Sequence, residues 1–271
     1  MIKMGKTNLD ETYTWLLQEN TATIREITKK TSQTNKTTTK YVYDKIITPL
    51  LKAGKVERIR RGLYTAIDPI TNKPVADPVI VASKIRTPYY LGYYTALTLY
   101  GSAYSTRTQT HICIPPEKRF REFTYNGNTY TPIYTQDTKT NIQTINHRGH
   151  QIKVCGKERL LVELVENPQH IGGWEQALKS LETLGGIEYE KIPYMLEKKN
   201  TQILTRKTGY ILELLKQHSI YHRHLPEQVT HRIQTMVQGQ PEYLEKNQPG
   251  PLNKKWMLYI PEDFTEYLRG V

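Results

Sequence analysis

The sequence predicts an α+β protein in which an N-terminal winged helix-turn-helix is followed by a larger mixed α+β domain. The first 68 residues contain three helical patterns and then a basic hairpin pattern. A proline-rich stretch with Pro69, Pro74 and Pro78 comes next, as is typical of a domain boundary. Strand and helix patterns fill the rest of the chain. We therefore expect a DNA-binding domain at residues 1–68 and a second domain at residues 78–271.

Three helices are expected in the first domain. Apolar residues recur at helical spacing over residues 9–20. Thr23 and Glu26 form the capping-box pattern that starts a second helix at Ile24. The third helix is expected at residues 36–53. Its apolar stripe comprises Val42, Ile46, Ile47, Leu50 and Leu51.

Two residues, Pro49 and Gly54, should determine how the third helix ends. Gly54 suits the position just after a helix, where left-handed backbone is common. Pro49 has no N–H, so it should either kink the last turn or restart the helix with Thr48 as its cap.

A basic hairpin is expected after the third helix. Its strands at residues 56–59 and 63–67 flank Arg60, Arg61 and Gly62. Glycine supplies the positive φ that a tight hairpin turn needs. Three helices followed by such a hairpin is the element order of a winged helix-turn-helix.

The second domain is expected to mix strands and helices. Asp77 and Pro78 should cap and start its first helix. Asn126-Gly127 is a strong hairpin signal within residues 122–134. Further strands are expected at residues 110–115, 142–146, 151–155 and 256–260, and further helices at residues 90–101, 157–166, 174–184, 188–197 and 203–218.

Charge and composition limit the kinds of partner that the protein is expected to bind. The formal net charge is +12, and residues 1–68 hold 13 Lys and Arg against 7 Asp and Glu. About a quarter of the chain thus carries half of the excess, which favours a polyanion such as DNA. No apolar run approaches the ~20 residues that cross a bilayer, and the N-terminus lacks a secretory-signal pattern. We expect a cytoplasmic protein without a membrane partner.

Tyrosine is unusually frequent. Tyr outnumbers Phe by 20 to 3. A cluster of tyrosines in the second domain comprises Tyr89, Tyr90, Tyr93, Tyr94, Tyr100 and Tyr104. Because tyrosine offers apolar area together with a hydroxyl group, we expect many half-buried, interface-like aromatic side chains.

The third helix and the hairpin hold the candidate DNA contacts. A helix-turn-helix lays its second helix in the major groove, where Thr and Lys can contact base edges. Adjacent arginines at a hairpin tip suit the phosphate backbone or a narrow minor groove. The candidates are Lys36, Thr37, Thr38, Lys40, Tyr41 and Lys45 in the helix and Arg58, Arg60 and Arg61 in the hairpin. A winged helix can also dock a protein, but the basic bias in both elements favours DNA.

No pattern indicates a metal site. His218, His222, His224 and His231 are close in sequence, but Pro226 interrupts the segment and carboxylates that would support a metal site are scarce. We therefore expect surface histidines and no metal.

The enzyme interpretation is weaker than the DNA-binding one. Glu190 and Lys191 are adjacent and would face opposite sides of a strand, unlike the acid-x-Lys pattern of many nucleases. Glu158 and Glu163 are five positions apart on a helix and diverge, and Glu188 adds no pattern. The sequence also lacks a Gly-rich phosphate loop and a nucleophile elbow. We expect no catalytic residues and no cofactor.

Five segments share their order and spacing with a known family. They are Leu51–Tyr64, Tyr89–Gly101, Val154–Pro168, Gly172-Gly173 and Thr208–Glu213. Over roughly residues 20–215 the chain resembles the AbiE-type abortive-infection antitoxins, also described as viral-defence transcriptional regulators.

The resemblance implies an autoregulator that binds an inverted-repeat operator in double-stranded DNA upstream of its own operon. It also implies an antitoxin whose partner gene encodes a nucleotidyltransferase-type toxin. In that family the N-terminal domain represses transcription and the C-terminal domain carries the antitoxin activity. Two alternatives remain open: a stand-alone winged-helix transcription factor whose second domain senses a ligand or dimerises, and, more weakly, a DNA-processing enzyme.

Overall fold

The computed structural model describes residues 8–32, 38–246 and 248–268. The chain is of the α+β class and divides into two compact units. The first unit comprises Met1–Leu91, Thr108–Thr138 and Thr144–Lys153, and the second comprises Gly92–Arg107, Lys139–Gln143 and Val154–Val271. The proline-rich stretch at residues 69–77 lies inside the first unit, so the N-terminal helices share that unit with most of the large sheet.

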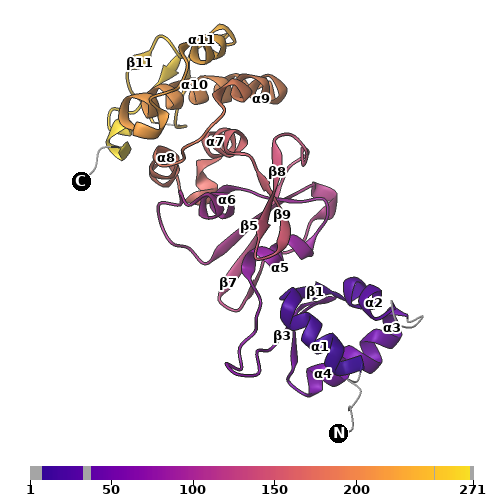
Figure 1. Ribbon diagram of the computed structural model, residues 1–271. Coiled ribbons are helices and arrows are strands. Elements are labelled where there is room, and N and C mark those ends of the chain that lie inside the picture. The colour runs from indigo at the N-terminus through magenta and orange to yellow at the C-terminus, as the bar shows by residue number, and fades with distance from the viewer. Residues whose placement is uncertain (1–7, 33–37, 247, 269–271) are drawn as a thin grey trace. The chain divides into compact units, whose positions relative to one another are not determined.

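Figure 1 shows the order of the elements along the chain. In the first unit the helices are α1 (Asn8–Glu19), α2 (Ile24–Ser32), α3 (Thr39–Val42), α4 (Thr48–Lys52) and α5 (Pro78–Ile85). The strands are β1 (Thr21–Thr23), β2 (Val56–Arg60), β3 (Leu63–Ala66), β4 (Tyr90–Leu91), β5 (Gln109–Ile114), β6 (Phe123–Tyr125), β7 (Asn128–Tyr134), β8 (Ile142–His147) and β9 (His150–Cys155), and the last two contribute residues to both units.

The second unit is mainly helical. Its helices are α6 (Tyr93–Tyr100), α7 (Lys157–Glu166), α8 (Trp174–Glu182), α9 (Ile192–Lys199), α10 (Gln202–His218) and α11 (Glu227–Thr235). Its short strands β10 (Glu242–Tyr243), β11 (Leu252–Asn253) and β12 (Leu258–Tyr259) form a sheet in the order β10-β12-β11. Helix α10 packs against α7, α8 and α11. Helix α11 and strands β10 and β11 were not predicted from the sequence.

Two helices begin at the caps that the sequence predicts. The Thr23 hydroxyl accepts a hydrogen bond from the Glu26 N–H at 3.2 Å, and the Glu26 carboxylate accepts one from the Thr23 N–H at 2.8 Å. This reciprocal pair is the expected capping box. The Asp77 carboxylate caps α5, accepting bonds from the N–H groups of Val79 at 2.9 Å and Ile80 at 3.2 Å.

The third predicted helix runs without interruption from Thr39 to Lys52, but its middle part, Tyr43–Ile47, is π-helical. The Thr48 N–H donates to the Tyr43 carbonyl, five residues back. Thr48 has helical angles, φ −60° and ψ −45°, and no side-chain capping bond begins α4, so the predicted restart at Thr48 was wrong. A π turn shifts the hydrogen-bond register by one residue just before Pro49, whose ring and missing N–H disturb a regular α-helix.

An apolar core joins the N-terminal elements. The predicted stripe is buried at Val42, Ile46, Ile47 and Leu50 and half-buried at Leu51. Its partners in this core are Leu16, Ala22, Ile27, Val56, Tyr64 and Ala66. Burial of one face of the helix leaves its opposite face exposed.

The predicted hairpin is present as β2 and β3. Gly62 makes the turn with φ +79°, and the pairing has a bulge between Arg58 and Arg60. Strand β1, expected from the sequence only as the approach to a helix cap, pairs antiparallel with β3 and gives a sheet in the order β1-β3-β2.

The larger sheet has the order β6-β7-β5-β4-β9-β8, with β5 and β7 parallel. The predicted Asn126-Gly127 turn joins β6 to β7, and both residues have positive φ. The helix predicted at residues 90–101 begins only at Tyr93, because Tyr90 and Leu91 pair with β5 as the short strand β4.

Candidate nucleic-acid interface

The exposed face of the α3–α4 helix carries most of the predicted helical contacts. Thr38, Lys40, Tyr41 and Lys45 are all exposed, and Tyr41 is 48% exposed. Lys36 and Thr37 lie outside the described residues. The described candidates thus stand on the surface opposite the buried stripe, as the helical spacing predicts.

Thr38 has a structural role of its own. Its backbone is extended, with φ −93° and ψ 155°, and its hydroxyl oxygen accepts a hydrogen bond from the Tyr41 N–H at 3.2 Å. Thr38 is therefore the N-cap of α3. Its hydroxyl hydrogen remains available as a donor to a bound molecule.

The three hairpin arginines differ in their surroundings. Arg58 and Arg61 are exposed, whereas Arg60 is half-buried. The Arg60 guanidinium lies over the rings of Phe120 and Phe123, 5.3 and 4.8 Å from their centroids. Burial, and after it the positive charge of Arg86, lowers the pKa of Arg60 from its ordinary value. The sequence predicts the same role for these three arginines, but in the structure only Arg60 is half-buried and lies over aromatic rings.

A hollow of about 700 Å³ lies between α3 and the hairpin. The residues that line it are Ile24, Thr39, Lys40, Tyr43, Arg58, Ile59, Arg60, Arg61, Gly62 and Tyr64. Four of these side chains are cationic, and none of the described lining residues is a carboxylate. A concave surface with cations on two sides and no acid suits a phosphate-bearing ligand.

Two tyrosines in this hollow were not predicted from the sequence. Tyr43 is exposed at 40%, while Tyr64 is buried. Burial, and after it the nearby Tyr43, raises the pKa of Tyr64, so its phenol stays protonated and can donate a hydrogen bond. The signal for Tyr43 was its place one residue outside the apolar stripe; the position of Tyr64 depends on the β3 pairing.

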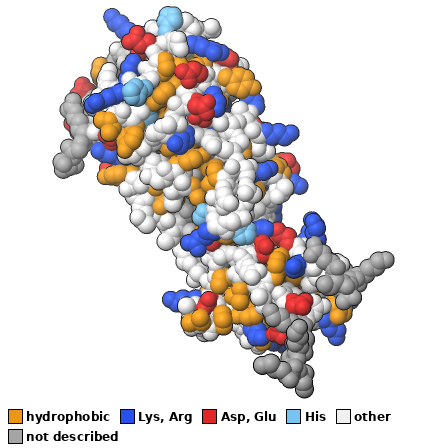
Figure 2. Space-filling view, viewed as in Figure 1, with side chains coloured by type: hydrophobic (Ala, Val, Ile, Leu, Met, Phe, Trp, Pro, Cys, Tyr) orange, Lys and Arg blue, Asp and Glu red, His pale blue; other side chains and the backbone are white. Residues whose placement is uncertain are grey.

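Surface charge alone does not mark this region. On the face shown in Figure 2, basic side chains of the N-terminal part are mixed with acidic and apolar ones. The arrangement of cations around one hollow, rather than a uniform charge density, therefore distinguishes the candidate interface.

The other chemical groups considered in the sequence make internal contacts. Glu158 accepts hydrogen bonds from Asn141 at 2.7 Å and from the Glu188 N–H at 2.8 Å. Glu163 forms a buried ion pair with Arg159 at 2.7 Å. Glu158 thus ties α7 to the segments that carry Asn141 and Glu188, whereas the Arg159–Glu163 pair lies within α7 itself.

The histidine segment departs from expectation at one position. His218, His224 and His231 are exposed, but His222 is fully buried, so its prediction as a surface residue was wrong. Within residues 8–32, 38–246 and 248–268, no group of His, Cys, Asp and Glu side chains has a metal-binding arrangement.

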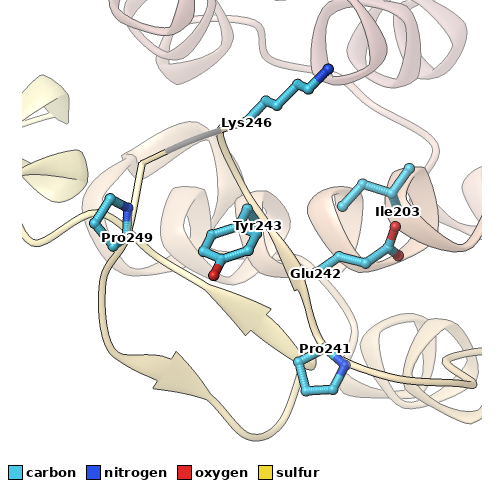
Figure 3. Close-up of a pocket in the computed structure, with 6 residues that line it drawn as sticks. All are labelled: Ile203, Pro241, Glu242, Tyr243, Lys246 and Pro249. Carbon is cyan, nitrogen blue, oxygen red and sulfur yellow. The ribbon is translucent and has the colours of Figure 1, made fainter.

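A second hollow, of about 500 Å³, lies in the second unit (Figure 3). It is lined by Ile203, Pro241, Glu242, Tyr243, Lys246 and Pro249. The Glu242 carboxylate already pairs with the buried Arg206 at 2.5 Å, and the Tyr243 ring stacks on Tyr259 with centroids 4.9 Å apart. The Lys246 side chain extends away from Tyr243 (Figure 3). This hollow offers an aromatic face but few convergent polar groups.

Comparison with known proteins bears on the fold. No family model matches the chain, and no curated protein matches its sequence. The structure is similar to the crystal structure of the RV2827C protein from Mycobacterium tuberculosis, with a TM-score of 0.62 and 14% sequence identity over 97% of this chain and 94% of that one. The two chains therefore share an architecture along nearly their whole lengths.

None of the helices in the described part of the chain combines the length and the apolar composition needed to cross a bilayer.

Proposed function

We propose that residues 8–67 form a winged helix-turn-helix that binds double-stranded DNA, in a protein that regulates transcription. The observation that carries this proposal is the hollow between α3 and the β2–β3 hairpin, with cationic side chains and no carboxylate among its described lining residues. In this geometry α3 enters the major groove and the hairpin, as the wing, lies along the backbone.

The proposed roles follow from exposure. Lys40, Tyr41 and Lys45 face base edges from the exposed side of the helix. Arg58 and Arg61 contact phosphates from the wing, where exposed guanidinium groups can form paired hydrogen bonds. The helix would supply sequence preference and the wing affinity.

Binding can be measured by mobility shift with the full chain, a duplex from upstream of its own gene and an unrelated duplex of equal length. Arg61→Ala should weaken binding to both duplexes alike and reduce the slope of log K against log salt by about 0.9. Tyr41→Ala should instead change the preference between duplexes, by about 1–3 kcal/mol if one interaction with a base is removed. The exposed Lys254→Ala is the control. Salt-insensitive binding, or none, would refute the proposal.

We propose further that the protein is an autoregulator and the antitoxin of a nucleotidyltransferase-type toxin. The resemblance of the five sequence segments to the AbiE-type antitoxins supports this role, together with an operator made of inverted repeats. A large helical unit beyond the DNA-binding elements is also more structure than DNA recognition requires.

A stand-alone transcription factor that senses a small ligand is the second candidate. The hollow of about 500 Å³ beside Tyr243 is the observation that favours it. Co-expression with the product of the neighbouring gene separates the two candidates, because only an antitoxin rescues growth when that product is toxic.

A further inference from the structure

Arg60 connects the hairpin to the large sheet within the first unit. Its guanidinium stacks on Phe120, which is buried, and on Phe123 at the start of β6. Phe123 in turn stacks on Tyr130 of β7, with centroids 4.9 Å apart and planes 15° from parallel. A flat guanidinium packs on aromatic rings in a specific geometry, so this stack fixes the hairpin beside the segment that carries Phe120.

A second arginine, Arg86, lies over one of the same aromatic rings. The Arg86 guanidinium lies 5.8 Å from the Phe120 ring centroid, and its charge contributes to the lowered pKa of Arg60. Arg60 Nη1 is buried without a hydrogen-bond partner, and neither arginine forms an ion pair with the described residues. Two guanidinium groups held together repel each other, and an anion between or beside them relieves that repulsion.

The segment around Phe120 adds exposed cations. Lys118, Arg119 and Arg121 are exposed, and none of them forms an ion pair within the part of the chain that the structure describes. The Lys118 carbonyl accepts a hydrogen bond from Arg86 Nε at 3.1 Å, which fixes the segment beside the two arginines. Two exposed acids, Glu117 and Glu122, flank it, so the segment is a local cationic site and not a uniformly basic stretch.

We propose that Arg60, Arg86, Lys118, Arg119 and Arg121 form a second contact with duplex DNA, next to the wing, that binds backbone phosphates. This inference rests on the proposed DNA binding and extends its footprint from the N-terminal elements to the edge of the large sheet. Arg60 belongs to both parts, because it stands on the hairpin and stacks on the sheet. Contacts of this kind add affinity without sequence preference.

The test compares two triple variants of the full chain that remove the same charge. Lys118→Ala, Arg119→Ala and Arg121→Ala together should reduce the slope of log K against log salt by about 0.9 for each phosphate that is no longer bound, equally for specific and unrelated duplexes. The matched control carries Lys73→Ala, Lys216→Ala and Lys254→Ala, and its slope should equal that of the wild-type chain. A test variant that behaves like this control would overturn the inference.

A second variant tests the link through Arg60. Arg60→Lys keeps the charge but removes the flat stacking group, so binding should weaken, and thermal unfolding of the free protein, compared with that of Arg61→Lys, measures the stability that the stack supplies. Unchanged binding by Arg60→Lys would overturn the role of Arg60 as the link. If the wild-type chain bound no DNA, both the proposed function and this inference would fail; wild-type binding with an unaffected triple variant would refute the inference alone.

Discussion

Three interactions converge on the carboxylate of Glu26. It accepts hydrogen bonds from the N–H and the hydroxyl of Thr23, both at 2.8 Å, and pairs with Lys84 of α5. Burial acts to raise the pKa of Glu26, but the hydrogen bonds from Lys84 and Thr23 and the charge of Lys84 outweigh it, so this pKa lies below 4.5. One side chain thus starts α2 and ties it to α5.

We predict that Glu26→Gln, which keeps the capping pattern but removes the charge that pairs with Lys84, lowers the free energy of unfolding by up to about 1 kcal/mol at neutral pH, the usual scale for a part-exposed ion pair. Because the folded carboxyl has the lower pKa, its contribution is complete above pH 4.5 and is lost as the pH falls through the folded pKa. Urea denaturation should therefore show the two proteins converging in stability below pH 4.5. Glu11→Gln, at an exposed position of α1, should follow the wild type throughout. A difference that stayed constant with pH would contradict the prediction.

His222 uses both ring nitrogens inside the second unit. Its Nε2 lies 2.7 Å from the Leu181 carbonyl, and its Nδ1 lies 2.8 Å from the Tyr189 hydroxyl. A carbonyl can only accept, so Nε2 carries the hydrogen and Nδ1 accepts from Tyr189. Burial lowers the pKa of His222 despite the opposing effects of the Leu181 carbonyl and Glu182.

This neutral histidine should make stability depend on pH. Its folded pKa lies below the unfolded value of 6.5, so the unfolded chain binds the extra proton and stability falls as the pH drops below 6.5. His222→Gln should flatten this part of the pH profile, measured by thermal unfolding, and the exposed His224→Gln should leave it unchanged. Equal profiles for His222→Gln and the wild type would show that His222 does not titrate in this way.

Residue types and spacing predicted the exposed side of the candidate interface but not the surroundings of each residue. Lys40, Tyr41 and Lys45 face outward because helical periodicity fixes their direction once the stripe is buried. Arg60 and Arg61 are neighbours of the same type, and only the position of β6, far along the sequence, determines which of them stacks on aromatic rings. The tyrosine cluster is likewise mostly interior: Tyr89, Tyr90, Tyr93 and Tyr94 are buried, Tyr100 is half-buried and Tyr104 is exposed.

At the scale of elements, Gly209 permits a close contact on α10. A Cβ placed on Gly209 would lie 2.1 Å from the Trp256 ring. The Trp256 indole N–H donates to the Glu213 carboxylate at 2.6 Å, and Trp256 is fully buried. The segment Thr208–Glu213 thus accommodates the side chain of Trp256, which lies in the turn between β11 and β12.

We predict that Gly209→Ala destabilises the protein by about 1–3 kcal/mol, the usual range for overpacking, although alanine favours a helix. Gln217→Ala, at an exposed position of the same helix, should be neutral or slightly stabilising. Urea denaturation followed by tryptophan fluorescence gives both values. Equal stability of Gly209→Ala and Gln217→Ala would mean that the Trp256 ring moves aside without cost.

Elements with local chemical signals were predicted well. The capping box, the Asp77 cap, and the glycine turns at positions 62 and 127 lie where sequence placed them, because their partners are within a few residues. The short strands β1, β4 and β10 were missed because each exists only through pairing with a distant strand. Local propensity carries no information about such partners.

At the scale of the molecule, the first unit joins segments from three separate parts of the sequence. The proline-rich stretch predicted a boundary, yet contacts tie its two sides together within this unit. The Asn20 side chain accepts a hydrogen bond from the Asp77 N–H at 2.5 Å, and Glu26 pairs with Lys84. Proline content reports local stiffness and turn formation, whereas the extent of a unit depends on such long-range contacts.

The proposed antitoxin role makes a prediction for the whole chain. A variant with Arg58→Ala and Arg61→Ala should lose DNA binding but still protect cells when the toxin is expressed from an unrelated promoter. Growth after toxin induction measures protection, and a Lys73→Ala and Lys254→Ala variant should retain both activities. If protection vanished together with DNA binding, the two activities would not be separable; if the wild-type chain gave no protection from a toxin made at an unrelated promoter, the transcription-factor alternative would be favoured.

The π-helical turn at Tyr43–Ile47 has a consequence for how such proteins diverge. This turn holds one residue more than a regular α-helical path. Deleting one codon there would therefore restore a regular α-helix, and the segments before and after the turn would keep their directions. Lys40 and Tyr41 would stay on the exposed side, and the core residues after the turn would stay buried. A one-residue deletion in a regular α-helix would instead turn its two ends by about 100° relative to each other, so this turn is the place where the helix can lose a residue without rearranging its two faces.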